Sequence, residues 1–204
     1  MRTPKIEALY RLIKWWNIEN PTKYISKLEL DLSSIDHNSW LSGFAEADGN
    51  YYLKWDKSKK SKSVISRPIN IIYYFRLSQR QYFKRKVDPD IIVSNKIFMG
   101  KIAKYLKTEL ININRTRVSW TEKGYLIKTD RVESKNKLFS YFDNYPLFGY
   151  KYFACSNLKN IHHLILTSEY KTEYGKLKFE EYSNLMKYDS MKHNWSHLNK
   201  FYDI

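Results

Sequence analysis

The chain has 204 residues, of which 43% are apolar and 17% aromatic, so it can bury the core of one domain but not of two large ones. The aromatic content excludes an intrinsically disordered chain, and the single cysteine, Cys155, excludes an internal disulfide and any cysteine-based zinc site. No stretch approaches the about 18 apolar residues that span a bilayer, so no membrane partner is expected. Lysine and arginine number 36 against 21 acidic residues, and the net charge of +15 favours an anionic polymer as partner.

The first predicted element is a basic amphipathic helix over residues 4–16, in which Ile6, Leu9 and Ile13 recur at helical spacing. A transit peptide has a similar pattern, but Glu7 and the lack of serine favour a helix of the mature fold. After this helix, Asn20-Pro21-Thr22 is predicted to be a break, and residues 23–38 to be extended or irregular.

The remaining elements alternate between helical and strand-like patterns. Helices are predicted over 39–47, over a segment from Ile97 to Leu110, from Leu138 to Tyr145-Pro146, and over 152–168 and 176–188. Strands are predicted at 51–55, 69–77, 112–120 and 124–129. The order is α, then αββαββα, then αα, which is typical of an α+β domain with helices on one face of the sheet and the other face free for a partner.

We expect one domain over residues 1–204. Its parts are an N-terminal helix and lead-in at 1–38, the αββαββα core at 39–150, and C-terminal helices with a tail at 151–204.

The predicted helix at 39–47 carries an unusual pattern of small and acidic residues. Gly43 and Ala47 lie four apart, hence on one helical face, and small residues at this spacing let a second backbone approach closely. Glu46 and Asp48 lie at the C-terminal end of the helix, where the dipole is negative and a cation would be stabilising. Two such helices side by side would make a divalent-cation site, whereas a lone helix would leave its acids in solvent.

Residues 41–49, Leu-Ser-Gly-Phe-Ala-Glu-Ala-Asp-Gly, resemble the LAGLIDADG motif of homing endonucleases and intron maturases. The matching positions are Leu41, Gly43, Asp48 and Gly49, and Ser42 replaces the usual alanine. The resemblance extends along the whole chain. Residues 3–16 resemble the segment before the second motif of two-motif members, 75–80 the base-reading strand and its turn, 136–147 the helix after the second hairpin, and 151–152 and 191–198 the ends of organellar members.

The resemblance implies roles for several residues. Asp48 would ligate Mg²⁺, and the carbonyl of Ala47 would contribute to the same site. Lys135 would be the basic residue near the cleavage centre, and Gln79 would orient water or phosphate, although a plain surface position suits both equally well. The face that meets a second motif helix would consist of Leu41, Gly43, Phe44 and Ala47.

The resemblance also implies that the sheet lies in the major groove of DNA, with alternate strand residues facing the bases. The predicted contacts are Tyr52, Lys54, Arg76, Arg80, Arg115, Arg117 and Lys128. Loop lysines suit phosphates, where charge matters more than direction, and these are Lys57, Lys59, Lys60 and Lys62. The alternative is a solvated sheet face, or a strand phase shifted by one residue.

One motif alone leaves the function open, because an active site in this family needs two. The chain would pair with itself, pair with a separate first half, or have abandoned cleavage. The main hypothesis is a metal-dependent endonuclease or maturase. The alternative is a non-catalytic RNA-binding protein in a large RNA assembly such as the mitochondrial ribosome, and a third is a DNA binder without cleavage. The abundance of Lys, Asn, Ile, Tyr and Phe implies A/T-rich codons and favours an organelle, such as the mitochondrion, as the source.

Overall fold

The computed structural model describes residues 2–3, 6–57, 68–84, 92–117, 119–187 and 195–200. The chain falls into two compact units, each made of several stretches of sequence. The first comprises Met1–His37, Ser78–Tyr105 and Glu109–Ile127, and the second comprises Asn38–Leu77, Leu106–Thr108 and Lys128–Ile204. The residues predicted for the motif helix and its surroundings lie in the second unit.

The second unit holds most of the helices, and its elements are α2 (Trp40–Asp48), β1 (Gly49–Lys57), the greater part of β2 (Pro68–Arg80), α4 (Val132–Asn144), α5 (Lys151–Leu166), the short η2 (Glu169–Lys171), α6 (Glu173–Leu185) and η4 (Ser196–Lys200). The first unit contains α1 (Ile6–Glu19), η1 (Ile35–His37), the end of β2, β3 (Tyr82–Lys84), β4 (Ile92–Ser94), α3 (Lys96–Tyr105), β5 (Ile111–Arg117) and nearly all of β6 (Trp120–Lys128).

Four strands form the main sheet in the order β1-β2-β6-β5, and β3 pairs with β4 in a separate two-stranded sheet. The pairs β1–β2 and β5–β6 are antiparallel. In the first pair Tyr52 lies opposite Tyr74, and in the second Arg115 lies opposite Glu122. This α+β arrangement confirms the predicted order of elements, with the extra helices at both ends.

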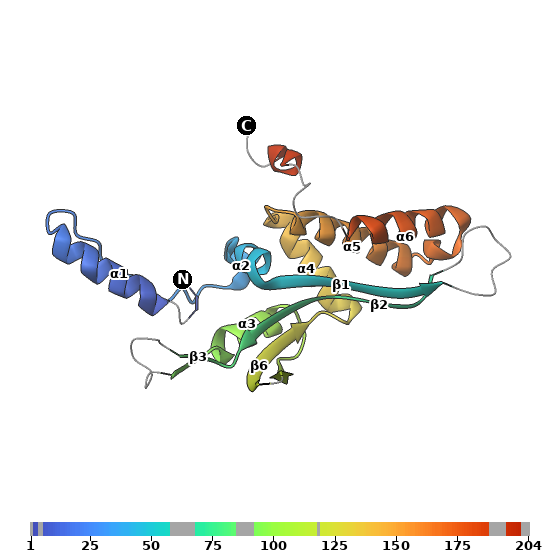
Figure 1. Ribbon diagram of the computed structural model, residues 1–204. Coiled ribbons are helices and arrows are strands. Elements are labelled where there is room, and N and C mark those ends of the chain that lie inside the picture. The colour runs from blue at the N-terminus through green and yellow to red at the C-terminus, as the bar shows by residue number, and fades with distance from the viewer. Residues whose placement is uncertain are drawn as a thin grey trace. The chain divides into compact units, whose positions relative to one another are not determined.

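Helices α5 and α6 lie side by side along one face of β1 and β2 (Figure 1). Their buried residues Ile161, Leu164 and Phe179 form a core against strand residues that include Leu53, Trp55 and Ile71. The indole of Trp55 also donates a hydrogen bond of 2.8 Å to Ser183 Oγ of α6. Successive strand residues point to opposite faces, so Tyr52 and Lys54 of β1 and Tyr74 and Arg76 of β2 point away from these helices.

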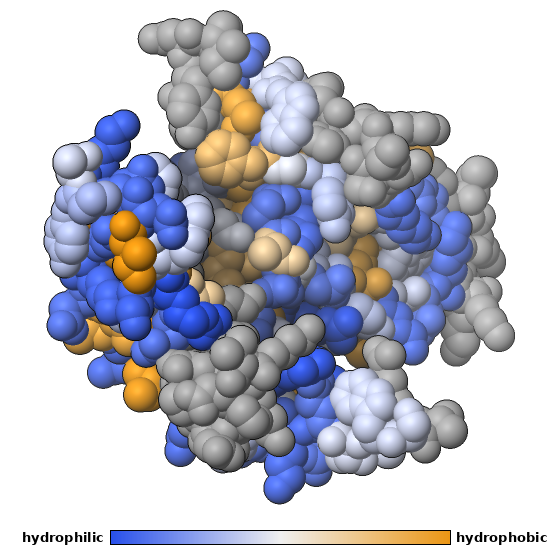
Figure 2. Space-filling model, turned by 60° about the vertical axis from the view of Figure 1, so that its left-hand side comes forward, coloured by the Kyte–Doolittle hydropathy of each residue, from blue (hydrophilic) through white to orange (hydrophobic). Residues whose placement is uncertain are grey.

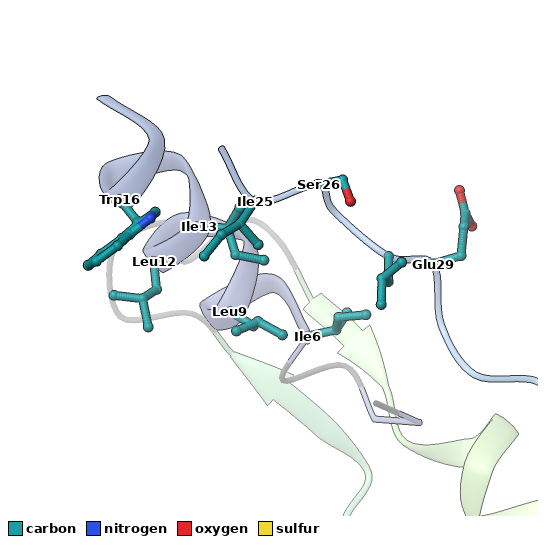
Figure 3. Close-up of a pocket in the computed structure, with 9 residues that line it drawn as sticks. Ile6, Leu9, Leu12, Ile13, Trp16, Ile25, Ser26 and Glu29 are labelled. Carbon is teal, nitrogen blue, oxygen red and sulfur yellow. The ribbon is translucent and has the colours of Figure 1, made fainter. Parts of the chain in front are cut away.

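In the first unit, side chains of α1 hold the extended lead-in beside the helix. Asn17 exchanges two hydrogen bonds with the backbone of Ile25, and Tyr10 Oη donates to the carbonyl of Leu28 at 2.6 Å. An apolar groove of about 410 Å³ lies between the two segments, and Leu9, Ile13 and Ile25 point into it (Figure 3). The predicted irregular segment 23–38 therefore follows α1 back along its own length.

Several predicted boundaries were wrong: α4 begins at Val132 and not at Leu138, and β5 ends at Arg117 and not at Trp120. Two further differences have a local cause. The helix expected to run from Ile97 to Leu110 ends at Tyr105, because Lys107 takes a left-handed conformation with φ 53° that stops a helix. Gly124, expected to open a strand, lies within β6, where an added Cβ would approach the Gln79 carbonyl oxygen to 3.0 Å. The β3–β4 pair was not predicted, because two strands of three residues are too short to show alternation.

Candidate functional site

The motif helix α2 is fixed from beneath by the end of α4. Leu41 and Ala45 are completely buried, and the backbone N–H of Leu41 donates to Tyr141 Oη at 3.1 Å. The same Tyr141 hydroxyl donates to the carbonyl of Asn38 at 2.8 Å, and Ser42 Oγ donates to the carbonyl of Tyr145. The helix therefore has its position set by buried contacts roughly a hundred residues away in sequence.

The opposite face of α2 is open. Gly43 and Ala47 are exposed, and a Cβ built on Gly43 would meet no atom within 4 Å. Phe44 is half-buried and stacks on Trp40, with ring centroids 5.1 Å apart. The structure places Leu41 in the chain's own core rather than on this face, because a side chain two positions from Gly43 points to the other side of a helix.

The last residue of the motif is a glycine for a steric reason. A Cβ on Gly49 would lie 2.5 Å from the carbonyl oxygen of Ala45 and 2.6 Å from the ring of Phe75. Because Gly49 has no Cβ, β1 can begin directly after α2 and pack closely against Phe75 of β2. This close approach leaves Asp48, the residue just before it, at the exposed end of α2.

The C-terminal end of α2 already carries a cation, the ammonium of Lys151 at the start of α5. Its Nζ donates to three backbone carbonyls, of Ala45 at 3.3 Å, Glu46 at 2.5 Å and Ala47 at 3.2 Å. The last carbonyls of a helix lack partners within it and carry the negative end of the dipole, so a lysine here is stabilising. Burial lowers the pKa of Lys151, while Glu46 and Asp48 act to raise it.

The two acids of the motif have different surroundings. Glu46 Oε2 accepts a hydrogen bond of 3.2 Å from the backbone N–H of Phe148, and a Cβ on Gly149 would lie 2.6 Å from Glu46 Oε1. Glu46 is thus held against the turn before α5, whereas Asp48 is exposed. Asp48 lies at the solvent-exposed C-terminal end of α2, and the Ala47 carbonyl accepts a hydrogen bond from Lys151.

Lys135, the basic residue that the resemblance placed near the cleavage centre, is buried beside Tyr73. Its Nζ sits 4.3 Å from the ring centroid of Tyr73 and donates to the carbonyl of Asp130. Tyr73 pairs with Leu53, four residues along β1 from Gly49, which corresponds to roughly 13 Å along the strand. The structure therefore brings Lys151, and not Lys135, to the end of α2. Gln79 is half-buried near the end of β2, in the other unit.

The network continues from Tyr73 to a neutral histidine. Tyr73 Oη lies 2.7 Å from His162 Nδ1, and His162 Nε2 lies 2.8 Å from Asn136 Oδ1. Burial, with the nearby charge of Lys135, lowers the pKa of His162 from 6.5 to about 4, and burial raises the pKa of Tyr73 to about 12. His163 is exposed on the other side of α5, as expected for adjacent helix residues. The side chains of Tyr73, His162 and Asn136 are thus uncharged, and they lie beside the buried Lys135.

The outward face of β1 and β2 combines aromatic and basic side chains. The rings of Tyr52 and Tyr74 stack with centroids 4.8 Å apart, and Lys128 Nζ lies 4.4 Å from the Tyr74 ring. Lys54 and Arg76 are exposed on the same face. The phase predicted for these strands is therefore the phase observed, and the face presents cations beside flat rings.

The other predicted contacts have varied surroundings. Lys57 is exposed and pairs with Glu180 of α6 at 2.6 Å. Arg80 and Arg115 both pair with Glu122 in the first unit. Lys59, Lys60, Lys62 and the side chain of Arg117 lie outside the described residues.

Hydrophilic residues cover much of the described surface in the view of Figure 2, with apolar residues in separate patches. Of the helices in the described part of the chain, none is both long and apolar enough to cross a bilayer. Nor do the described residues contain a group of three or more His, Cys, Asp or Glu side chains that could hold a metal ion by themselves. At the end of α2, the exposed acid is Asp48. Mg²⁺ is usually bound through one or two carboxylates together with substrate phosphates, which Asp48 suits if a second carboxylate joins it.

The sequence profile described as LAGLIDADG endonuclease matches residues 41–162. The intron-encoded DNA endonuclease aI3 of Saccharomyces cerevisiae is 26% identical over 225 residues, which cover 99% of this chain and 52% of that protein. The fold is similar to a double lysine mutant of I-SmaMI, with a TM-score of 0.52 at 16% identity, covering 86% of this chain and 53% of the other. The meganuclease I-SmaMI bound to uncleavable DNA gives a TM-score of 0.50 at 16% identity, covering 85% and 51%. The chain thus spans about half the length of these relatives.

Proposed function

Because this chain belongs to the LAGLIDADG endonuclease family, we propose that it binds a DNA duplex on the outward face of its sheet and hydrolyses phosphodiesters when α2 pairs with a second motif helix. The observation that carries the proposal is the end of α2. There an exposed carboxylate, Asp48, lies beside an open helical face made of Gly43 and Ala47.

Pairing is proposed because the open face offers what close helix packing requires. The space around Gly43 and the small side chain of Ala47 allow a second backbone to approach. The buried contacts of Leu41 and Tyr141 keep α2 rigid while this happens. The second helix would come from another copy of this chain or from a separate half-protein.

Asp48 would hold Mg²⁺ together with the equivalent acid of the second helix and a phosphate of the substrate. The metal would lower the pKa of bound water and stabilise charge on the leaving oxygen. Lys151 holds the end of α2 in place through its three carbonyl contacts, and so fixes the direction of Asp48. The sequence alone did not predict this role for Lys151, because Lys151 lies more than a hundred residues after Asp48.

Duplex binding is proposed on the outward face because Lys54, Arg76 and Lys128 give it positive charge on a rigid sheet. A net charge of +15 supports affinity for the phosphate backbone. An I-SmaMI structure of similar fold contains DNA, which supports a duplex as the ligand here. We also propose an organellar source for the chain, a prediction that rests on its codon-biased composition and on the resemblance to organellar members.

A second candidate is RNA binding without cleavage, as in a large RNA assembly. It is favoured by the stacked pair Tyr52–Tyr74 with Lys128 over one ring, since unpaired bases stack on aromatic side chains beside cations. Such binding would need neither Asp48 nor a second motif helix.

The test is to incubate the purified chain with Mg²⁺ and a library of duplexes, comparing wild type with Asp48→Asn. We expect cleavage by wild type and none by Asp48→Asn, with duplex binding kept in both. The matched control is Asp143→Asn, which neutralises an exposed acid that pairs with Lys159 on α5. Equal cleavage by wild type and Asp48→Asn would overturn the proposed role of Asp48. Absence of cleavage together with tight RNA binding by both would favour the second candidate.

Pairing is tested with Gly43→Leu, which should leave folding intact, because the site is open, but abolish assembly and cleavage. Gly100→Leu is the control, since a Cβ on Gly100 of α3 also meets nothing within 4 Å. Sedimentation should show a smaller species for Gly43→Leu alone. An unchanged assembly state in Gly43→Leu, with wild-type cleavage, would refute pairing through this face.

A further inference from the structure

Three strands place one carboxylate between two arginines on the sheet of the first unit. Glu122 lies on β6, the strand between β2 and β5, and it is directly opposite Arg115 in the β5–β6 register. Arg115 Nη1 lies 3.4 Å from Glu122 Oε2, and Arg80 Nε of β2 contacts Glu122 Oε1. Arg115 Nη2 also donates to Ser78 Oγ on β2, so its side chain crosses over β6. Both arginines are thereby oriented by the same acid.

The cluster lies on the side of β6 opposite its buried residues. Tyr125 and Ile127 of β6 are buried, and alternation puts Glu122 on the other face of the strand. The side chain of Glu122 is only 14% exposed, whereas those of Arg80 and Arg115 are 72% and 41% exposed. The arginines thus cover the carboxylate and are themselves open to a ligand.

We propose that Glu122 is a positioning residue that orients Arg80 and Arg115 to recognise guanine in the major groove of a bound duplex. The inference rests on the proposed function, in which the outward side of β2, the strand that carries Arg80, meets DNA. A guanidinium held in one orientation can donate two hydrogen bonds to guanine O6 and N7, the commonest specific contact of arginine with a base. The carboxylate limits the rotamers of both arginines and so reduces the entropy that binding would otherwise cost.

Guanine fits the cluster better than phosphate does. Phosphate contacts depend mainly on charge and carry no sequence information. Glu122 reduces the charge of the cluster and would repel a phosphate, while it improves the direction of both guanidinium groups. An acid at this place therefore weakens general affinity and favours selectivity.

The test is selection of duplexes from a randomised library by the full chain, with base preference measured at each position. Wild type should prefer guanine by roughly 5- to 150-fold at one or two positions. Glu122→Gln, which keeps the shape of the side chain, should lose most of that preference while binding arbitrary duplexes at least as tightly. Arg80→Lys keeps the charge but not the two-pronged donor, and should lose preference at one of the same positions.

The control is Glu180→Gln, which removes an acid that also pairs with a basic side chain, Lys57, outside this cluster. It should leave the guanine preference unchanged. Thermal unfolding of each variant checks that folding is kept, and Arg80→Lys still tests the proposal if Glu122→Gln fails to fold.

Three outcomes would overturn the inference, and they separate it from the proposed function. Unchanged guanine preference in folded Glu122→Gln or in Arg80→Lys would refute the positioning role while leaving duplex binding in place. Loss in Glu122→Gln with no loss in Arg80→Lys and Arg115→Lys would mean that Glu122 itself contacts a base. Failure of wild type to bind any duplex would instead reject the proposed function, and this inference with it.

Discussion

Helix α2 is held from beneath by buried side chains, whereas the outward face of β1 and β2, in the same unit, is built from side chains that point into solvent. Leu41 and Ala45 of α2 are completely buried, and Tyr141 and Lys151 bond its two ends. On the sheet, Lys54 and Arg76 are exposed, and the rings of Tyr52 and Tyr74 stack on each other. The helix depends on contacts from distant parts of the chain, and the sheet face depends on the strands that carry it.

This difference separates what a substitution should do in each region. A change under α2 removes buried contacts, so it should lower the free energy of unfolding and misplace Asp48. A change on the outward face leaves the core intact, so it should alter affinity for a polyanion and leave stability nearly unchanged. The predictions below test this separation from the largest expected effect to the smallest.

The largest expected effect is that of salt concentration on the affinity of the outward face for a duplex. With roughly 6–10 phosphate contacts, affinity for a duplex should fall about 10³- to 10⁵-fold between 50 and 200 mM salt. Lys54→Gln should reduce the slope of log affinity against log salt by about 1, with stability changed by less than about 0.5 kcal/mol. Fluorescence anisotropy at a series of salt concentrations measures both. A flat salt response would show that this face is not the binding surface.

Beneath α2, Leu41→Ala should cost about 2–5 kcal/mol in the free energy of unfolding, because it removes a completely buried side chain and leaves a cavity. Leu12→Ala on α1 is the matched control, since Leu12 is 57% exposed and should cost much less. Urea denaturation gives both values. Equal losses in the two variants would contradict the claim that α2 is anchored by its buried face.

A pH effect should come from the covered face of β2, through His162. Its folded pKa of about 4 lies below the ordinary 6.5, so the unfolded chain binds more protons between these values. This contribution to stability is present above pH 6.5 and is lost as pH falls towards 4, by up to about 3 kcal/mol. Between pH 7 and pH 4, the urea midpoint of His162→Gln should fall less steeply with falling pH than the midpoint of wild type. His163→Gln, at the exposed neighbour, should keep the slope, and loss of the slope there would point to a different titrating group.

The smallest of these effects is expected for Lys151→Met, which removes the donor to three carbonyls at the end of α2. The loss should be about 1–3 kcal/mol, because the carbonyls are left partly unsatisfied. Lys159→Met, which breaks an exposed pair with Asp143, should cost less than about 1 kcal/mol. If the loss in Lys151→Met is no greater than in Lys159→Met, Lys151 does not hold the helix end.

The sequence alone sufficed for the order of elements, for the motif helix and for the phase of the outward strands. These features are local: the period of apolar residues identifies helices and strands, and Asp48-Gly49 marks where α2 meets β1. Alternation then places Tyr52 and Lys54 on one face once the strand is recognised. The resemblance to the family added the expected roles of Asp48 and of the open helical face, which remain predictions.

Tertiary structure decided which distant side chains meet. Lys151 donates to the carbonyls of α2 from more than a hundred residues away in sequence. Lys135 packs against the ring of Tyr73, and Glu122 lies between arginines of two other strands. No local period records these contacts, because they depend on how strands and helices are stacked and in which order the strands lie in the sheet. From the sequence, a lysine, a glutamate or an arginine is predicted only to lie on the surface. The partner that each side chain contacts is decided by the packing of the chain.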